Sequence, residues 1–163
     1  MTNSVDIQVA DAIVAALRAA TFDIEVPTIE RTYADVNREL ESLEEIRIDV
    51  IPWDCQVEQD SRGTHEYVIE TDIVIRQRFG QQSQDADSGL IAKEKVDALG
   101  KLRQDVYELF APAQSTHSGS LDDTDAMFTD VELAEVMHKD MWQKYRQFTA
   151  VIRTTHVWNK SPG

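Results

Sequence analysis

Cysteine, positive charge and long apolar runs are all scarce in this chain. The single cysteine, Cys55, excludes an internal disulfide. The longest uninterrupted apolar runs, such as residues 12–17, fall far short of the roughly 20 residues that a membrane-spanning helix needs. The first residues also lack the basic stretch and apolar run of a signal peptide. We therefore expect neither a membrane span nor export.

The deficit of positive charge is large. The 163 residues include 16 Lys and Arg against 30 Asp and Glu, a net charge of −14 at pH 7. So acidic a chain is not expected to bind nucleic acids generally, because that binding depends on neutralising phosphates. Apolar residues make up 42% and charged residues 28%, ordinary values that argue against a wholly disordered chain. The length predicts one domain, residues 1–163, able to bury a core without disulfides or metals.

Three segments have the spacing of amphipathic helices. Residues 5–20 gather apolar side chains on one side and polar side chains on the other. Residues 90–110 give the strongest pattern, because apolar side chains follow Leu99 at i+3, i+7 and i+10. Residues 35–45 predict two or three further turns.

Other segments have the pattern of strands. Residues 46–53 and 65–79 alternate apolar and polar side chains, and we expect them to form an antiparallel hairpin across a polar loop at 54–64. Residues 21–30 favour a short or edge strand. Residues 148–158 are rich in β-branched and aromatic side chains and predict a closing strand.

One capping motif and two polar stretches complete the prediction. Thr129 and Glu132 match the T-x-x-E capping box and predict a short helix that reaches Met137. Residues 80–89 and 111–125 have the composition of exposed loops. The predicted class is α+β: an antiparallel sheet of about four strands, packed by the N-terminal helix and the central helix.

The cysteine and histidines do not indicate a metal site. They are widely spread and match none of the C-x-x-C, H-x-x-x-H or H-E-x-x-H spacings of zinc proteins. Separate surface or packed side chains are the more common explanation. Cys55 would be a nucleophile only beside a base and an orienting group, which the sequence does not place. The residues are Cys55, His65, His117, His138 and His156.

Acidic clusters give no cation site either. A calcium loop that starts at Asp123 would place Phe128 where the motif requires glycine. No glycine-rich phosphate loop opens a predicted helix, and carboxylates are too abundant for a glycosidase-type pair to be diagnostic. We expect no catalytic, cofactor-binding or metal-binding residue, and hence no enzyme.

Basic and aromatic side chains leave two interpretations open. Basic residues on both sides of loop 80–89, from Arg76 to Lys95, form either a local positive patch or ordinary charged surface, and the overall acidity favours the second. Aromatic side chains serve as core anchors or interface anchors. Trp53, beside the hairpin loop, favours an interface role, whereas Trp142 and Tyr145 fit either role equally.

The segment IERTYADVNRELESLEEIRIDVIPW resembles a part of small neck and tail proteins of long-tailed bacteriophages. Those proteins carry an R-x-Y motif, a short helix and a strand that ends V-x-V-x-P. The closing segment RQFTAVIRTTHVW resembles their last strand, and the hairpin and central helix occur between the two in the same order. The matching residues are Arg31, Tyr33, Leu40, Leu43, Ile46, Ile48, Val50 and Pro52.

The family that this pattern resembles is the phage tail terminator, also described as the tail completion or head-tail joining protein. The resemblance implies a virion protein, made in the host cytoplasm, whose α+β subunits form a ring of about six copies at the neck. Such a ring caps the tail tube, ends its polymerisation and presents a surface to the head connector. Rotationally closed, heterologous contacts make a ring rather than a filament.

The expected partners are therefore further copies of the chain, the tail tube protein and the head-closure or connector protein. DNA would pass through the strongly negative ring without specific binding, since no phosphates are neutralised. Loops 54–64, 80–89 and 111–125 are expected to contact partners. The predicted interface residues are Trp53, Asp54, Arg62, Arg78, Gln82, Asp85, Asp87, Asp122, Asp123, Trp142 and Tyr145.

Two alternatives remain at this point. The chain could be another neck protein, either a head-closure protein or a connector adaptor. It could also be a small cytoplasmic enzyme or ligand-binding domain, which predicts a deep pocket with convergent polar groups.

Overall fold

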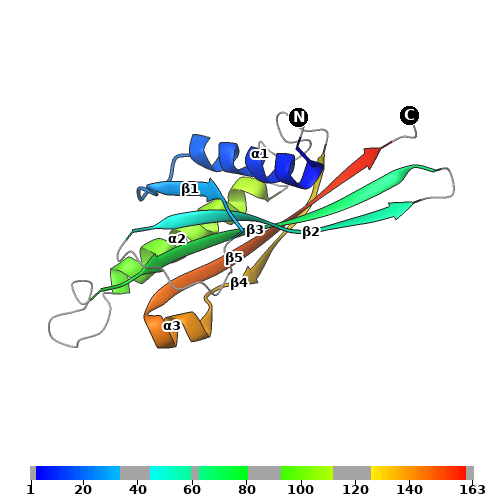
Figure 1. Ribbon diagram of the computed structural model, residues 1–163. Coiled ribbons are helices and arrows are strands. Elements are labelled where there is room, and N and C mark those ends of the chain that lie inside the picture. The colour runs from blue at the N-terminus through cyan, green and yellow to red at the C-terminus, as the bar shows by residue number, and fades with distance from the viewer. Residues whose placement is uncertain (1–2, 34–44, 60–62, 81–92, 112–125, 161–163) are drawn as a thin grey trace.

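The computed structural model describes residues 3–33, 45–59, 63–80, 93–111 and 126–160. The described elements form an α+β fold, as predicted, in which helices pack on a five-stranded sheet (Figure 1). In chain order they are α1 (Val5–Ala19), β1 (Thr28–Arg31), β2 (Arg47–Gln59), β3 (His65–Arg78), α2 (Lys93–Phe110), β4 (Met127–Glu135), α3 (Lys139–Tyr145) and β5 (Gln147–Lys160).

The sheet is mixed, whereas the sequence predicted an antiparallel sheet of about four strands. Its strand order is β1-β2-β3-β5-β4. β2, β3, β5 and β4 pair antiparallel, but β1 runs parallel to β2, from Thr28 opposite Arg47 to Arg31 opposite Val50. β1 is a short edge strand, as predicted for residues 21–30, but it begins only at Thr28, after Pro27.

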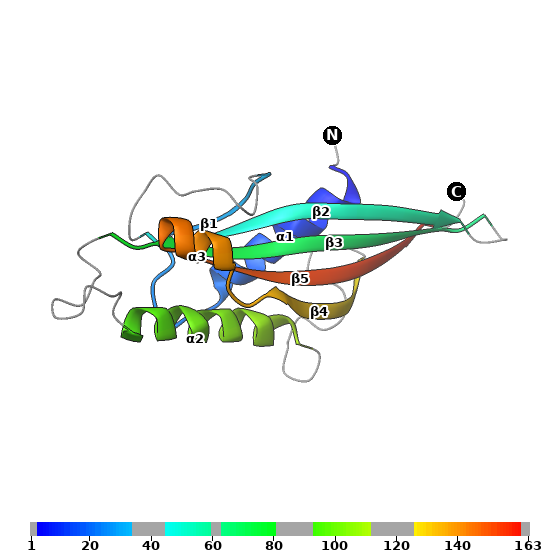
Figure 2. The same ribbon diagram turned by 90° about the horizontal axis from the view of Figure 1, so that it is seen from below.

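Helices α1 and α2 cover the same face of the sheet. α1 lies over β1, β2 and β3, and α2 lies against β5 and β4 (Figures 1 and 2). One buried cluster joins both helices to alternate residues of the strands, because successive side chains of a strand point to opposite faces. Its larger members include Ile13, Leu17, Ile48, Ile73, Ile75, Leu99, Leu102, Phe110, Phe148 and Ile152.

Helix α3 lies on the side of the sheet away from α1, beside the start of β5 (Figure 2). Its N-cap residue is His138, whose Nδ1 accepts a hydrogen bond from the Met141 amide at 3.4 Å. Arg146 ends the helix in the left-handed conformation, with φ of 51°. The ring of Trp142 meets Phe79 edge-on at 6.0 Å. The sequence did not predict α3, because seven residues barely show a helical period.

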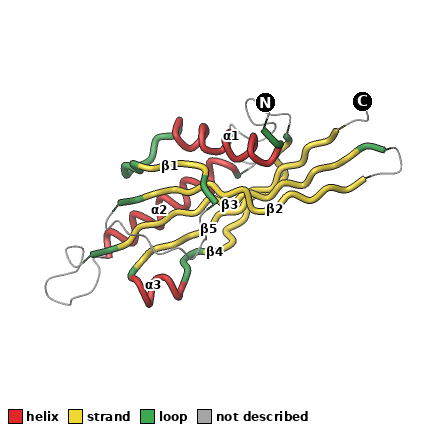
Figure 3. The backbone as a smooth tube through the Cα atoms, viewed as in Figure 1, coloured by secondary structure: helices red, strands yellow, loops and turns green. Residues whose placement is uncertain are grey.

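The predicted loop at 54–64 is wrong over its first half. β2 continues to Gln59, which pairs with His65. The polar composition of this stretch suggested a loop, yet it alternates, with Cys55 and Val57 opposite Ile69 and Tyr67 of β3. Together with β5, this outer part of the hairpin extends beyond the helices (Figure 3). We call residues 54–59 and 65–70 the hairpin arm.

The helix predicted from Thr129 is also wrong, because these residues form β4. Val131 and Leu133 have the period of a strand as well as that of a helix, and pairing with β5 decides between them. The Thr129 hydroxyl does not cap a helix but donates to the Thr155 carbonyl at 3.0 Å.

The remaining predicted elements either agree or lie beyond the described residues. The helix at 5–20, the hairpin strands 46–53 and 65–79, the helix at 90–110 over residues 93–110, and the closing strand at 148–158 all agree with α1, β2, β3, α2 and β5. The predicted helix at 35–45 and loops 80–89 and 111–125 lie almost wholly outside the described residues.

The cluster beneath the two helices predicts where substitutions destabilise the fold. Ile73→Ala removes a fully buried side chain from a central strand and should lower the free energy of unfolding by about 3 kcal/mol. Val57→Ala, in the exposed hairpin arm, should cost less than about 0.5 kcal/mol. Urea unfolding measures both, and equal losses would contradict this assignment of the core.

Candidate functional site

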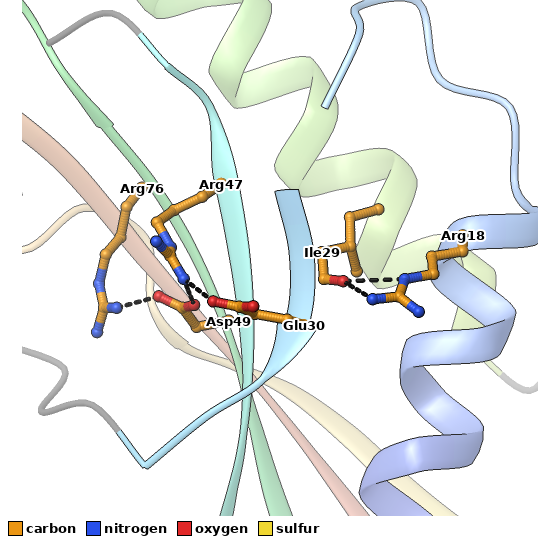
Figure 4. A network of polar contacts seen from close by, with 6 residues as sticks. All are labelled: Arg18, Ile29, Glu30, Arg47, Asp49 and Arg76. Atoms are coloured by element: carbon orange, nitrogen blue, oxygen red, sulfur yellow. Dashed lines mark hydrogen bonds and ion pairs between the residues drawn. The ribbon is translucent and has the colours of Figure 1, made fainter. Parts of the chain in front are cut away.

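The sheet face opposite α1 and α2 carries charged residues that are paired inside the protein. Asp49 is 1% exposed and its carboxylate forms ion pairs with two arginines. Arg47 binds it at 2.8 Å and also contacts Glu30 of β1, while Arg76, which is fully buried, binds its other oxygen (Figure 4). Because each buried charge has an opposite charge beside it, the network links β1, β2 and β3 without an unpaired ion.

A second network on the same face ends at an exposed tryptophan. Arg153 of β5 donates to Asp72 of β3 through two nitrogens, at 2.8 and 3.3 Å, and lies 3.9 Å from Glu132 of β4. Asp72 is 1% exposed, and its hydrogen bond is the main reason why the pKa of Arg153 is raised. The guanidinium carbon of Arg153 stands 5.6 Å from the centre of the Trp53 ring, a cation–π contact.

Trp53 is placed by an irregularity in β2. The register shifts between Pro52, which pairs with Thr71, and Asp54, which pairs with Glu70, so Trp53 is the extra residue of a β-bulge. Its side chain is 57% exposed. A bulge re-aims one side chain, and Arg153 then limits where the ring can move. The Trp53 ring therefore presents a large apolar surface in a restricted orientation.

Tyr33, just beyond β1, repeats this arrangement. It is 66% exposed, and the guanidinium of Arg31 lies 5.8 Å from its ring centre and donates to its hydroxyl at 3.0 Å. Arg31 is held in turn by Asp11 of α1 at 2.7 Å. Both exposed aromatics are therefore oriented by an arginine that a carboxylate fixes. Tryptophan, tyrosine and arginine are the residues that most often dominate protein interfaces.

The structure separates the predicted interface residues into two groups. Trp53 and Asp54 lie together in β2, where Asp54 is half-buried. Arg78, at the end of β3, and Trp142 and Tyr145, on α3, lie at the other end of the sheet, all half-buried. The other predicted residues lie outside the described part of the chain: Arg62, Gln82, Asp85, Asp87, Asp122 and Asp123.

Sequence reasoning missed Arg153 and Tyr33 as candidate interface residues. A signal for Arg153 existed, because it is the one Asp, Glu, Lys or Arg in the predicted closing strand 148–158, and such a charge is usually paired when buried. Tyr33 had only its place in the R-x-Y motif. Nothing in the sequence joined Arg153 to Trp53, because that contact depends on the register of β2, β3 and β5.

Cys55 is half-buried in β2, whereas His117 lies outside the described residues. Burial, followed by the charges of Asp6 and Asp54, raises the pKa of Cys55, which disfavours its thiolate. His156 is fully buried, edge-on to Phe128 at 5.5 Å, and neither ring nitrogen has a hydrogen-bond partner. Among the described residues, no three His, Cys, Asp or Glu side chains gather as metal ligands.

A depression elsewhere on the described chain lacks the features of an active site. This open depression of about 370 Å³ lies between α1 and β1, where the Arg18 guanidinium donates to the Ile29 carbonyl at 2.7 and 3.0 Å (Figure 4). It gathers no set of convergent ionisable side chains. No described helix combines the length and the apolar content needed to cross a bilayer.

No protein-family model and no curated protein sequence matches this chain. Exposed aromatic rings beside fixed guanidinium groups are common in protein interfaces. The Trp53–Arg153 pair and the Tyr33–Arg31 pair are two such arrangements in this structure.

The Asp72–Arg153 pair predicts a strong coupling energy. Asp72→Val leaves Arg153 without its buried partner and should lower the free energy of unfolding by about 3 kcal/mol, and Arg153→Met likewise leaves the Asp72 carboxylate unpaired. Replacing both together, Asp72→Val with Arg153→Met, should recover most of that loss, because no uncompensated charge remains. Urea unfolding of the two single variants and the double variant gives the coupling, and simple additivity would contradict it.

His156 predicts a pH dependence of stability. Burial lowers its pKa from 6.5 to about 4. Between pH 6.5 and pH 4 the His156 ring takes up a proton in the unfolded chain but not in the folded chain. The free energy of unfolding therefore falls as the pH drops through this window, by about 3 kcal/mol in total. His156→Leu should remove this part of the slope, which unfolding at several pH values would measure. Identical slopes for both proteins would refute it.

Proposed function

We propose that this chain is a structural subunit of the neck of a long-tailed bacteriophage, acting as its tail terminator. In this proposal about six copies form a ring that caps the tail tube, ends its polymerisation and joins the tail to the head connector. The order of the motifs and elements along the chain supports it, because it is the order found in the family that the sequence resembles.

One observation carries the proposal furthest: the exposed ring of Trp53, oriented by Arg153. A tryptophan that is 57% exposed has a surface that water solvates poorly, and fixing it in place reduces the entropy lost on binding. Such a residue suits a protein whose work is repeated contact with other subunits.

A ring also needs two different surfaces on each copy, because a heterologous contact joins unlike patches. The chain has exposed apolar residues near both edges of the sheet. Trp53 belongs to β2, near one edge. Leu133, in the edge strand β4, and Val136 and Met137 beyond it are 42%, 52% and 38% exposed. These patches are candidates for the two halves of a repeated contact.

The proposal predicts a specific assembly defect. Phages that carry Trp53→Ala should give tails of uncontrolled length, or heads and tails that remain unjoined. Trp53→Phe is the matched control and should assemble nearly normally, because a phenyl ring keeps an aromatic face for Arg153. Electron microscopy of particles made with each variant, and without the protein, measures the outcome.

Two results would end the proposal. One is normal tails and normal joining when the protein is absent. The other is absence of the protein from purified virions. A purified Trp53→Ala variant that unfolds at the same urea concentration as the unmodified protein would show that an assembly defect comes from lost contact, not from lost stability.

A further inference from the structure

The outer half of β2 is a strand edge that no described element covers. β1 pairs with β2 as far as Val50, whose carbonyl accepts the Thr32 amide at 3.0 Å. Beyond this point β2 continues to Gln59, paired with β3 on one side. From Gln56 onward its side chains are exposed. Each such residue carries backbone groups able to bond a further strand.

The other edges of the sheet are less open. At β1, the side chain of Arg18 donates twice to the Ile29 carbonyl. In β4 the register shifts twice, between Phe128 and Asp130 and between Leu133 and Glu135. Occupied carbonyls and bulges are common ways to prevent unwanted strand pairing. The edge at residues 54–59 has a regular register with β3 and neither protection.

The charges beside this edge determine which kind of segment can bind there. Asp54 lies opposite Glu70 and Glu58 lies opposite Glu66, so four carboxylates share one side of the hairpin arm. Like charges directly across two strands repel each other. In the described part of the chain, Glu58 and Glu66 have no ion-pair partner. On the other side of the strand Val57 is 53% exposed, so it can contact an apolar side chain.

We propose that residues 54–59 of β2 bind an extended segment of another protein, in which Lys or Arg alternates with apolar residues. The segment adds to the sheet as a strand beside β2. Its backbone bonds the open edge, its cations face Asp54 and Glu58, and its apolar side chains face Val57. This inference does not depend on the proposed ring.

A second copy of this chain does not supply such a strand. Pairing this edge with the same edge of a second copy would bring the carboxylates of Asp54 and Glu58 beside their own equivalents. The bulged edge strand β4 also carries carboxylates, at Asp130, Glu132 and Glu135. The sequences of segments 34–44, 81–92 and 112–125 are acidic, so they would be repelled by the same carboxylates. A basic segment from a different protein is the occupant that satisfies both charge and geometry.

Binding of a synthetic peptide tests the charge requirement. The probe is a labelled peptide of about six residues, with lysine alternating with valine, and fluorescence anisotropy on the full chain gives its Kd. Glu58→Lys with Glu66→Lys should raise that Kd about tenfold. Glu25→Lys, an exposed charge reversal beyond the other end of β2, should change it less than about twofold. The matching peptide with glutamate should not bind.

Proline substitutions test the backbone requirement. Of two neighbouring strand residues, one directs its amide to β3 and the other to the open edge. Proline at Gln56 and, separately, at Val57 should therefore give one destabilised protein and one that folds but loses the peptide. Hydrogen exchange should also slow at residues 54–59 when the peptide is added.

The inference is overturned by any of four results. These are no peptide binding up to about millimolar concentration, equal binding of the glutamate peptide, unchanged binding in the folded proline variant, and no slowing of exchange. Exchange at 54–59 that slows with protein concentration alone would also overturn it, because the occupant would then be a second copy.

Discussion

The pairing of β3 with β5 is the constraint on which the rest of the structure depends. The two strands are in continuous register from His65 opposite Lys160 to Arg78 opposite Gln147. That register places the isoleucines of both strands under α1 and α2, and places Asp72 directly opposite Arg153. A slip by one residue would turn every side chain to the other face, burying charges beneath the helices. Packing on one face and ion pairing on the other therefore select the same register.

Periodicity predicted the parts of the fold whose patterns are long. α1, α2, the hairpin and the closing strand each repeat an apolar spacing over enough residues to exclude the alternative period. Short or two-sided segments were not predictable in this way. Thr129–Glu132 satisfies a capping box and a strand at once, and it forms β4 because β5 offers its backbone partners. Residues 54–59 looked like a loop because their composition is mostly polar, although Cys55 packs against the core and Ile69 opposite it is fully buried.

The residues of the candidate site show the same contrast between local sequence pattern and long-range strand pairing. Trp53 was predicted as an interface residue, since a large aromatic side chain beside a hairpin favours that interpretation; the structure shows it 57% exposed, and the interface role stays a prediction. Its partner Arg153 was not predicted, because the two come from distant segments that only the sheet joins. No sequence motif marks the bulge at Trp53. It is visible only in the register, where Pro52 and Asp54 pair with the adjacent residues Thr71 and Glu70 of β3. Local patterns thus identify side chains, whereas register decides which of them meet.

The interior position of β5 in the sheet also affects how the chain reaches its fold. β4 joins the sheet through β5, and β3 has its second neighbour only when residues 147–160 have been made. Pairings between distant segments form slowly, because the entropy of loop closure must be overcome first. During translation the hairpin can form early, yet the edge of β3 that later pairs with β5 stays open to other nascent chains. Aggregation during synthesis, more than instability of the finished fold, is the hazard that this topology creates.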